Sequence, residues 1–449
     1  MAKLIDKSLF SVTDESGTVN MFSISLPVFF QLIINQLIAF ITTALISNFD
    51  PNLVTAMNAS NTLISAMSNV CYIASNGLAI ILAHDLGKGD KKSIETLIFT
   101  ALTFIYMIFF VMAIIFITFC EQLLSIMNLN AEVMELAKPY FISQVINTGI
   151  GLFGVILVSA MRCYGRIKLY VLITFVQVSL SATCMALFIY TPLGSFADMV
   201  TNIIVRNITI TSLAQIAIFA YFKHNQLKIG HKFNVNSIKR IARVGVPGTI
   251  SMISYNLSSV LTTVIIASLA MEFINYKVYI NYIVTFVACF GNSLGRGASV
   301  LIGRAKGAGH IEKVDKMHKT YLYTIITINL ILSLLCFAFS KPLFSIFDKD
   351  PNHYALIWQI FLIDVLVEVG RGGNHACEGT LNAVGDVRYT TIVSILSCWI
   401  NAVGLSFVFV NVLNLGIVGV WLALAIDEWS RALLYEIRWR KGRWVNKVI

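Results

Sequence analysis

Charged residues are scarce in this sequence. Asp, Glu, Lys and Arg together make up 12% of its 449 residues, whereas hydrophobic residues make up 57%, and the mean hydropathy is +0.78. A chain of this length needs many more polar side chains to cover a water-soluble body. The composition therefore excludes a soluble protein and predicts an integral membrane protein, most of whose surface faces lipid or other parts of the chain.

The sequence also lacks paired cysteines and a cleavable leader. Its eight cysteines stand singly in apolar stretches, with no CxxC pair and no spacing typical of metal ligands, so we interpret them as small core residues. The segment before Met21 is too polar to begin a signal peptide, and the apolar run from Met21 to Ile46 is too long for one. We expect this run to remain as the first membrane-spanning helix.

Long apolar runs are abundant, and a helix needs about 20 such residues to cross the hydrocarbon of a bilayer. Cutting the sequence at charges, Gly/Pro turns and polar clusters predicts twelve spanning helices, at residues 20–47, 53–83, 94–119, 133–160, 169–190, 199–222, 241–268, 275–303, 317–340, 353–383, 388–411 and 416–438. The connections between them are short. The predicted fold class is an all-α integral membrane protein without a sizeable soluble domain.

The net charge of +10 indicates orientation in the membrane. With both termini in the cytoplasm, 25 of the 33 Lys and Arg residues fall on the cytoplasmic side, where basic residues concentrate. No segment forms a soluble basic patch with interleaved aromatic residues, so no nucleic-acid partner is expected. We predict a multi-pass protein of the cell membrane, with both termini cytoplasmic and the lipid bilayer as its surroundings.

The sequence repeats itself at a constant offset. AHDLGKGDKKS at 83–93 corresponds to GRAKGAGHIEK at 303–313, and the same offset aligns Pro27 with Pro247 and Gly165 with Gly385. Gly and Pro at one constant offset indicate a duplication. We predict an N-terminal six-helix bundle at 1–222, a cytoplasmic linker at 223–240 and a C-terminal six-helix bundle with a basic tail at 241–449.

Each predicted half contains an even number of helices, so both halves enter the membrane in the same orientation. This predicts a parallel repeat, a pseudo-twofold along the membrane normal, and in such proteins substrate sites lie between the two bundles. We interpret the glycines of the duplicated motif, Gly87, Gly89, Gly307 and Gly309, as residues that allow a tight cytoplasmic turn.

The motifs together resemble those of a known family. GLAIILAHDLGKGDKKS after the second span, RCYGRIKLY after the fourth, their echoes GASVLIGRAKGAGHIEK and LNAVGDVRYT, GVPGTIS in the seventh span and the basic ending RWRKGRW are similar to the multidrug and toxic compound extrusion (MATE) family. The likeness covers nearly the whole chain. It implies a twelve-helix, two-bundle exporter that exchanges cationic organic compounds for Na+ or H+.

The tenth predicted span carries a regular series of ionisable side chains inside the membrane. Spacings of four, three, four and three residues place Asp364, Glu368, Arg371, His375 and Glu378 on one helical face. One interpretation is a buried salt-bridge ladder in which Arg371 neutralises an acid and holds this helix to a neighbour. The other is a water-accessible stripe that exchanges a proton or Na+ for a cationic substrate. No metal site is expected, since one helix offers too few ligands and HExxH is absent.

Other spans contribute weaker candidates. Tyr255 and Asn256 follow Pro247 at about the distance where MATE members often carry an acid, and the eighth span adds Asn281, Asn292 and Arg296. In the twelfth span, Asp427 and Glu428 can pair with Arg431, which we interpret as a structural ion pair. In the first span we expect Asn35, Gln36 and Thr42 to be secondary cavity residues.

The chain departs from the family pattern at two places. Many bacterial relatives carry an Asp on the first helix, whereas FITTALIS here offers only Thr42 or Thr43. Counting back from Gly385, the acid that several relatives use on the tenth helix falls close to Arg371, with Glu368 and His375 one turn to either side. Coupling is therefore expected in the C-terminal half. Hard oxygen ligands would suit Na+, and a desolvated carboxylate or His375 would suit H+.

Three functions fit these observations. The first is a secondary active antiporter, expected to be a monomer without a cofactor, which exports a small cationic compound against Na+ or H+. The second is a lipid-linked saccharide flippase of the same superfamily, which would need several cationic residues to hold pyrophosphate. The third is an intramembrane enzyme, which would rest only on His375 and Glu378. The motifs favour the antiporter and argue against an enzyme.

Overall fold

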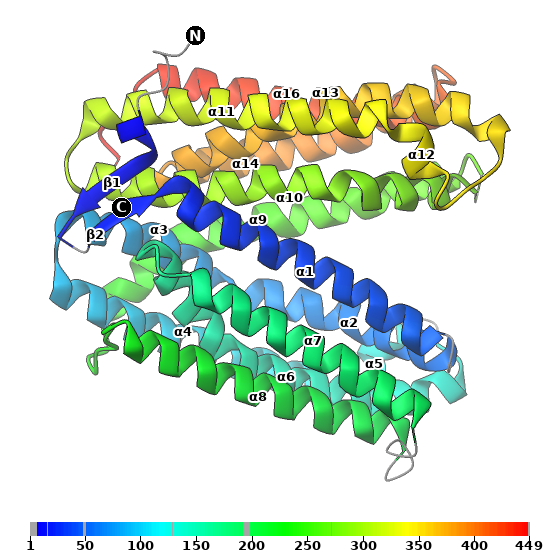
Figure 1. Ribbon diagram of the computed structural model, residues 1–449, viewed down its shortest axis with the longest axis horizontal. Coiled ribbons are helices and arrows are strands. Elements are labelled where there is room, and N and C mark those ends of the chain that lie inside the picture. Colours follow the sequence, from blue (N-terminus) through cyan, green and yellow to red (C-terminus); the bar gives the residue numbers. More distant parts are fainter. Residues whose placement is uncertain are drawn as a thin grey trace. The chain divides into compact units, whose positions relative to one another are not determined.

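A computed structural model describes residues 7–15, 17–47, 51–127, 129–191, 198–270 and 272–447 (Figure 1). Ten helical segments in the described residues are long and apolar enough to cross a membrane; one of them, Asn52–Lys88, joins two helices, and another, Val387–Asn411, joins three. Two further helices complete the set: α1 (Met21–Ser47), and α16 (Gly416–Arg440), which carries three charges near its middle. The twelve predicted spans are all confirmed as helices in the described part of the chain.

The helix bounds lie within a few residues of those predicted. After α1 come α2 (Pro51–Cys71), α3 (Ile73–Lys88), α4 (Lys91–Thr118), α5 (Cys120–Ser125), α6 (Ala131–Cys163), α7 (Lys168–Tyr190), α8 (Met199–His224), α9 (Val235–Ala267), α10 (Glu272–Gly307), α11 (Ile311–Ala338), α12 (Ser340–Phe344), η3 (Pro351–His353), α13 (Tyr354–Ala383), α14 (Val387–Ser397), the π-helix η4 (Cys398–Leu405), α15 (Ser406–Asn411) and α16.

A small β-hairpin precedes the first span, and sequence reasoning did not predict it. It follows the turn η1 (Lys7–Phe10) and pairs β1 (Ser11–Asp14) with β2 (Gly17–Asn20) in antiparallel register. Arg304 of α10, whose side chain is fully buried, donates from Nε to Asp14 Oδ2 at 2.7 Å. Tyr321 of α11 donates its hydroxyl to Leu9 O at 2.6 Å. These bonds attach the segment before α1 to two helices of the C-terminal half.

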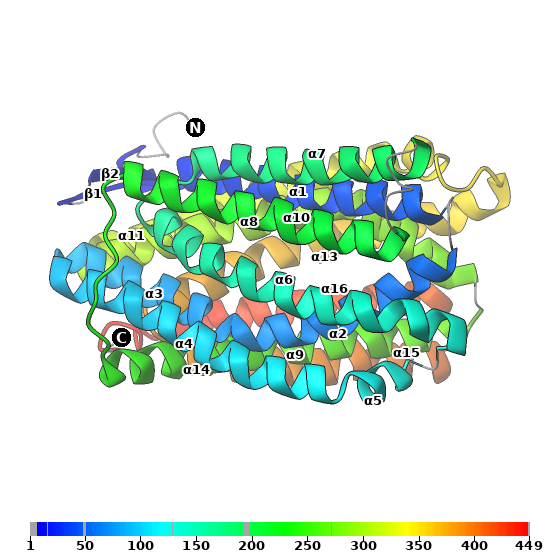
Figure 2. The ribbon, with the colours of Figure 1, turned by 90° about the horizontal axis from the view of Figure 1, so that it is seen from below.

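The chain forms two compact units. One contains Phe30–Leu82 and Asp90–Thr249, and its core includes Leu53, Tyr140, Met185, Val200 and Ile203. The other contains the residues up to Phe29, Ala83–Gly89 and the chain from Ile250 onward, with a core around Tyr276, Phe361 and Trp421. Within this second unit α13 packs against α16, α11 and α10 (Figures 1 and 2). The predicted domain limits at 222 and 241 stay a prediction.

The local structure repeats with the sequence. The offset that aligns the sequence motifs also aligns both ends of α4 with those of α11, and the start of the short helix α5 with that of α12. Four glycines at helix ends adopt positive φ, namely Gly89 (+75°), Gly165 (+69°), Gly309 (+80°) and Gly385 (+89°). L-residues rarely adopt this conformation, which explains why glycine stands at both copies of each turn.

The other two motif glycines serve a different purpose, and the interpretation of them as turn residues is wrong. Gly87 lies in the last turn of α3 and Gly307 is the last residue of α10, where the two helices approach each other closely. A Cβ atom on Gly87 would lie 2.0 Å from Arg304 O, and one on Gly307 would lie 2.0 Å from His84 O. The repeat relates these two contacts, because it aligns Gly87 with Gly307 and His84 with Arg304. Glycine is therefore needed here for close packing of helix backbones.

We predict that Gly87→Ala and Gly307→Ala each destabilise the protein by about 1–3 kcal/mol, because the added methyl group overlaps a backbone carbonyl. Gly248→Ala in α9 is the matched control, since a Cβ there meets nothing within 4 Å. That change should stabilise the helix by about 0.5–1 kcal/mol. Thermal unfolding in detergent measures both effects, and equal midpoints for the three variants would contradict the packing argument.

The duplicated turns should lie on one side of the membrane. Asp90→Cys and His310→Cys, both at exposed positions, should react with a membrane-impermeant maleimide only from the cytoplasmic side. Lys349→Cys, in a connection predicted to be outside, is the control and should react only from the other side. Opposite-side labelling of positions 90 and 310 would rule out the parallel repeat.

Candidate functional site

The predicted stripe of ionisable residues lies on one uninterrupted helix, α13. Asp364 and Glu368 are buried, with 5% and 0% of their surfaces exposed. Arg371, His375 and Glu378 are half-buried. The stripe faces elements of its own unit, because α13 packs against α10, α11 and α16.

A second set of charges on α16 meets this stripe. The set consists of Asp427, Glu428 and Arg431, all buried. Arg371 pairs with Glu368 on its own helix and donates from Nε to Glu428 Oε1 at 3.2 Å. Arg431 pairs with Asp427, and its Nη2 also lies 3.2 Å from Glu428 Oε1. Glu428 is thus shared by two guanidinium groups from two helices.

Neutral donors bind three further carboxylate oxygens of the cluster. Asn374 Nδ2 donates to Glu428 Oε2 at 2.8 Å, and Trp421 Nε1 donates to Asp364 Oδ1 at 3.1 Å. Ser397 donates its hydroxyl to Asp427 Oδ1 at 2.7 Å. Asn401 donates to Ser397 from the π-helix η4. Wide helical turns of this kind are frequent at functional sites.

The charges of this cluster do not balance. It holds four carboxylates, Asp364, Glu368, Asp427 and Glu428, against the two guanidinium groups of Arg371 and Arg431. Two negative charges remain when all six groups are ionised. Oxygen Oε2 of Glu368 is buried and accepts no hydrogen bond from the described residues. Because an uncompensated buried charge is costly, the site favours binding of a proton or another cation.

Of the other predicted residues, one contacts the cluster and the rest lie elsewhere. Tyr255 joins the cluster from α9, since its ring centroid is 5.8 Å from the guanidinium carbon of Arg431. Asn256 is exposed, as are Asn35, Gln36 and Asn281. On α10, Arg296 donates from Nε to Asn292 Oδ1 at 2.8 Å, one turn away. The side chain of Thr42 falls outside the described residues.

Sequence reasoning recognised the ion pair within α16 but missed its role in the site. The spacing of Asp427, Glu428 and Arg431 predicted the local pairs, and the structure confirms them. It did not predict that Glu428 also binds Arg371, which lies 57 positions away. One feature of the sequence could have indicated this contact. Ionisable residues in a membrane span require partners, and both α13 and α16 are rich in ionisable residues.

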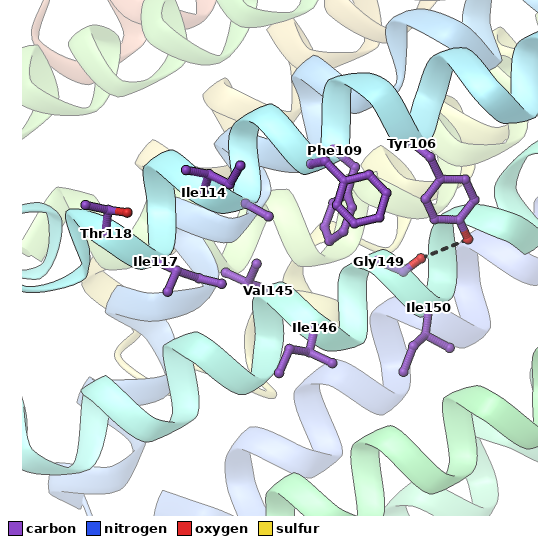
Figure 3. A pocket seen from close by; sticks show the side chains of 11 residues that line it. Tyr106, Phe109, Ile114, Ile117, Thr118, Val145, Ile146, Gly149 and Ile150 are labelled. Atoms are coloured by element: carbon purple, nitrogen blue, oxygen red, sulfur yellow. Dashed lines mark hydrogen bonds between the residues drawn. The ribbon is translucent and has the colours of Figure 1, made fainter.

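A separate apolar cavity of about 640 Å³ lies in the other unit (Figure 3). Side chains of α4 and α6 line it, among them Phe109, Ile114 and Ile146. Its wall includes Tyr106, whose hydroxyl donates to Gly149 O at 3.2 Å, as the dashed line in Figure 3 shows. The lining suits an acyl chain or another apolar group and offers no charge for ion coupling.

Comparisons with known proteins cover almost the whole chain. The sequence model of the MatE family matches residues 27–188 and 247–407. The two matched segments start at Pro27 and Pro247, which the internal repeat aligns with each other. An uncharacterised transporter of Bacillus subtilis, YisQ, is 25% identical over 459 residues, covering 100% of this chain and 99% of the relative. A probable multidrug resistance protein NorM of Thermotoga maritima is 23% identical, with 95% and 93% covered.

Solved structures share the fold. A MOP superfamily transporter from Pyrococcus furiosus, described as having a binding pocket of reverse polarity, matches with a TM-score of 0.84 and 16% identity, covering 95% of this chain and 96% of that one. A variant of a MATE transporter from Vibrio cholerae matches with a TM-score of 0.86 and 15% identity, with 95% and 98% covered. The predicted fold class, twelve transmembrane helices in two bundles, is confirmed.

The shared role of Glu428 gives a test of what holds the cluster together. Glu428→Gln removes the carboxylate that the two arginines share, while Arg371 keeps Glu368 and Arg431 keeps Asp427. We predict a loss of about 1.5–3 kcal/mol, the usual contribution of a hydrogen bond to a charged group. Glu368→Gln should cost less, because it breaks one ion pair within α13 and none between helices. Thermal unfolding in detergent compares the two, with the exposed Glu312→Gln as control. If Glu368→Gln is as damaging as Glu428→Gln, Glu368 belongs to the structural ladder.

Proposed function

Because the chain belongs to the MatE family of transporters, we propose that it is a secondary active antiporter that exports small cationic organic compounds in exchange for a cation. The excess negative charge of the α13–α16 cluster supports this proposal most strongly. Glu368 pairs with Arg371, and that guanidinium is shared with Glu428. A cationic substrate and a coupling ion would compete for the same uncompensated carboxylates.

The pattern of hydrogen bonds favours a proton as the coupling ion. Only Oε2 of Glu368 lacks a partner among the carboxylate oxygens of the cluster that are fully buried in the described residues. A single oxygen can hold a proton, whereas Na+ needs several oxygen ligands around it. Protonation of Glu368 would also lower the negative charge of the cluster and so weaken its attraction for a cationic substrate.

Exchange then follows from the deprotonated and protonated states of the Glu368 carboxylate. Deprotonated Glu368 attracts the cationic compound from the cytoplasmic side, and a proton from outside displaces it after the protein has opened outward. The carboxylates outnumber the arginines in this cluster, which disfavours a pyrophosphate-binding flippase because that function needs a surplus of cationic groups. The relatives are transporters, which agrees with transport rather than enzymatic chemistry.

The remaining parts of the proposal concern placement. The protein spans the membrane many times, as its apolar helices show. We propose that it acts as a monomer in the cell membrane with both termini in the cytoplasm, because most basic residues then lie on the cytoplasmic side. We propose multidrug substrates because relatives such as NorM of Thermotoga maritima are named as probable multidrug resistance proteins.

Transport by purified protein in liposomes tests the mechanism. We predict that an imposed proton gradient drives ethidium transport by the wild type and that Glu368→Gln abolishes it, because the amide keeps the volume and removes the titratable charge. Asp364→Asn should weaken transport, since it lowers the negative charge beside Glu368. Glu312→Gln, at an exposed position near the start of α11, is the control.

Two outcomes would contradict this proposal. If a Na+ gradient drives transport equally well without a proton gradient, the coupling ion is Na+ and not a proton. Normal gradient-driven transport by Asp364→Asn, Glu368→Gln and His375→Gln alike, in protein that melts as the wild type does, would remove the α13 stripe as the coupling site.

A further inference from the structure

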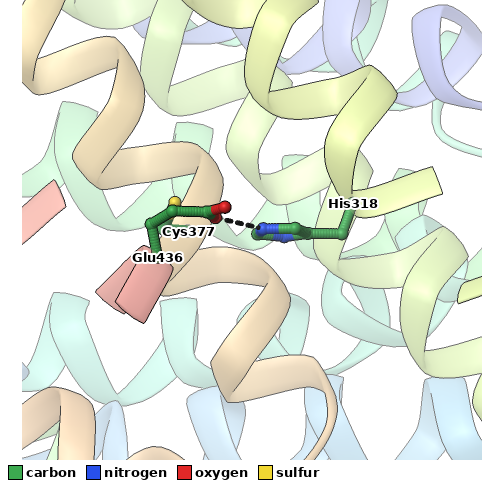
Figure 4. A group of neighbouring side chains, drawn as sticks. All are labelled: His318, Cys377 and Glu436. Carbon is green, nitrogen blue, oxygen red and sulfur yellow. Dashed lines mark hydrogen bonds and ion pairs between the residues drawn. The ribbon is translucent and has the colours of Figure 1, made fainter. Parts of the chain in front are cut away.

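A second group of ionisable side chains lies on the same unit, apart from the ion-pair cluster. His318 of α11, Cys377 of α13 and Glu436 of α16 each direct one potential ligand atom into a common space, and these atoms all lie within 4.8 Å of one another. His318 is completely buried, Cys377 is buried, and the side chain of Glu436 is 15% exposed. Figure 4 shows the three side chains converging from three helices.

The hydrogen bonds around His318 fix its protonation pattern. Thr380 Oγ1 lies 2.8 Å from His318 Nδ1 and also 3.0 and 3.1 Å from the carbonyl oxygens of Ala376 and Cys377. A hydroxyl has one proton, and the carbonyl oxygens can only accept it. When this proton serves one of the two carbonyl oxygens, Thr380 accepts from His318 Nδ1–H, and this is the tautomer that we assign.

This assignment leaves Nε2 as the free ligand atom of a neutral imidazole. His318 Nε2 lies 2.9 Å from Glu436 Oε2, so two lone pairs would face each other across a hydrogen-bond distance. Such a pair is stable only with a cation between or beside the two atoms. A proton is one such cation. The thiol of Cys377 at the same place makes a metal ion the better match, because a thiolate adds a third strong ligand.

We propose that His318 Nε2, Glu436 Oε2 and Cys377 Sγ form a binding site for a divalent cation of the zinc type. Nitrogen, sulfur and carboxylate oxygen are the ligands that Zn2+ takes in proteins, commonly with a fourth position open to water. Binding replaces the thiol proton of Cys377, which leaves to solvent, and forms the metal–sulfur bond.

The surroundings have the features of a metal site. Histidine ligands typically donate their other ring N–H to a neighbouring acceptor, as His318 does to Thr380. The second carboxylate oxygen of Glu436, Oε1, accepts from Arg440 Nε at 2.6 Å. The imidazole stacks on Trp439 at a centroid distance of 3.9 Å and an angle of 15°. These contacts hold the ligands in place. A metal ion would enter from the solvent-exposed side of the site, where Arg440 lies.

Cobalt binding to the purified full-length protein tests the site. After treatment with a chelator, the wild type should bind one equivalent of Co2+ with the absorption band of a cobalt–thiolate bond. Cys377→Ser should lose that band, whereas Cys71→Ser, at another buried cysteine, should keep it. Thr380→Ala, which leaves all three ligands in place, should weaken binding by about 10–100-fold.

The result does not depend on transport, so it is separate from the proposed function. Folding of each variant is checked by its thermal midpoint, and Glu436→Gln, near the surface, serves if Cys377→Ser does not fold. It should weaken Co2+ binding by at least about tenfold. No cobalt–thiolate band in folded wild type would overturn the proposal and leave a shared proton between His318 and Glu436. A band that survives Cys377→Ser would place the metal elsewhere and also overturn it.

Discussion

The carboxylate of Glu428 is the contact on which the C-terminal charge cluster depends. Ionised groups within a membrane need opposite charges beside them. Two arginines on two helices each have one carboxylate partner on their own helix, and both share Glu428. Arg371 belongs to α13, whereas Glu428 and Arg431 belong to α16, so a shift of one helix against the other would break the ion pair between Arg371 and Glu428. We infer that α13 and α16 move as one body during transport, and that any change of charge occurs at Asp364 and Glu368 instead.

The duplication gives both halves a similar arrangement of helices, but the charge cluster of α13 and α16 belongs to the C-terminal half. Glycines recur at the offset of the repeat in both pairs of helix-end turns and at the contact between α3 and α10. The site does not recur. The residues that this offset aligns with Asp364, Glu368 and Arg371 are Gln144, Thr148 and Gly151, none of which is charged. Backbone geometry therefore requires glycine at these turns in both halves. The charge cluster is needed in one half.

Much of this fold is predictable because membrane spans have a strong local signal. A long run of consecutive apolar residues and the charges that flank it suffice to place each helix, and the bounds agree closely for α7 and α8, where the predicted and observed starts differ by at most one residue. The β-hairpin was missed because polar residues near a terminus give no such signal. Its position depends on Asp14 meeting Arg304, which lies 290 residues away.

The sites are less predictable than the helices, for a related physical reason. Spacing along one helix predicts which residues share a face, and this was enough to find the α13 stripe. It says nothing about which other helix that face meets. Glu428 reaches Arg371 across 57 residues and Glu436 reaches His318 across 118. Both groups are formed only when α16 packs on its neighbours.

The two groups also share their helices, which relates the proposed metal site to transport. Cys377 follows Arg371 by six residues on α13, a rise of about 9 Å along a helix. A metal ion held by His318, Cys377 and Glu436 would add α11 to the pair already joined through Glu428. Three helices would then move together, while Asp364 and Glu368, which contribute no ligand, would keep their freedom to bind and release a cation. Such an ion would stiffen the unit that carries the coupling site without neutralising it.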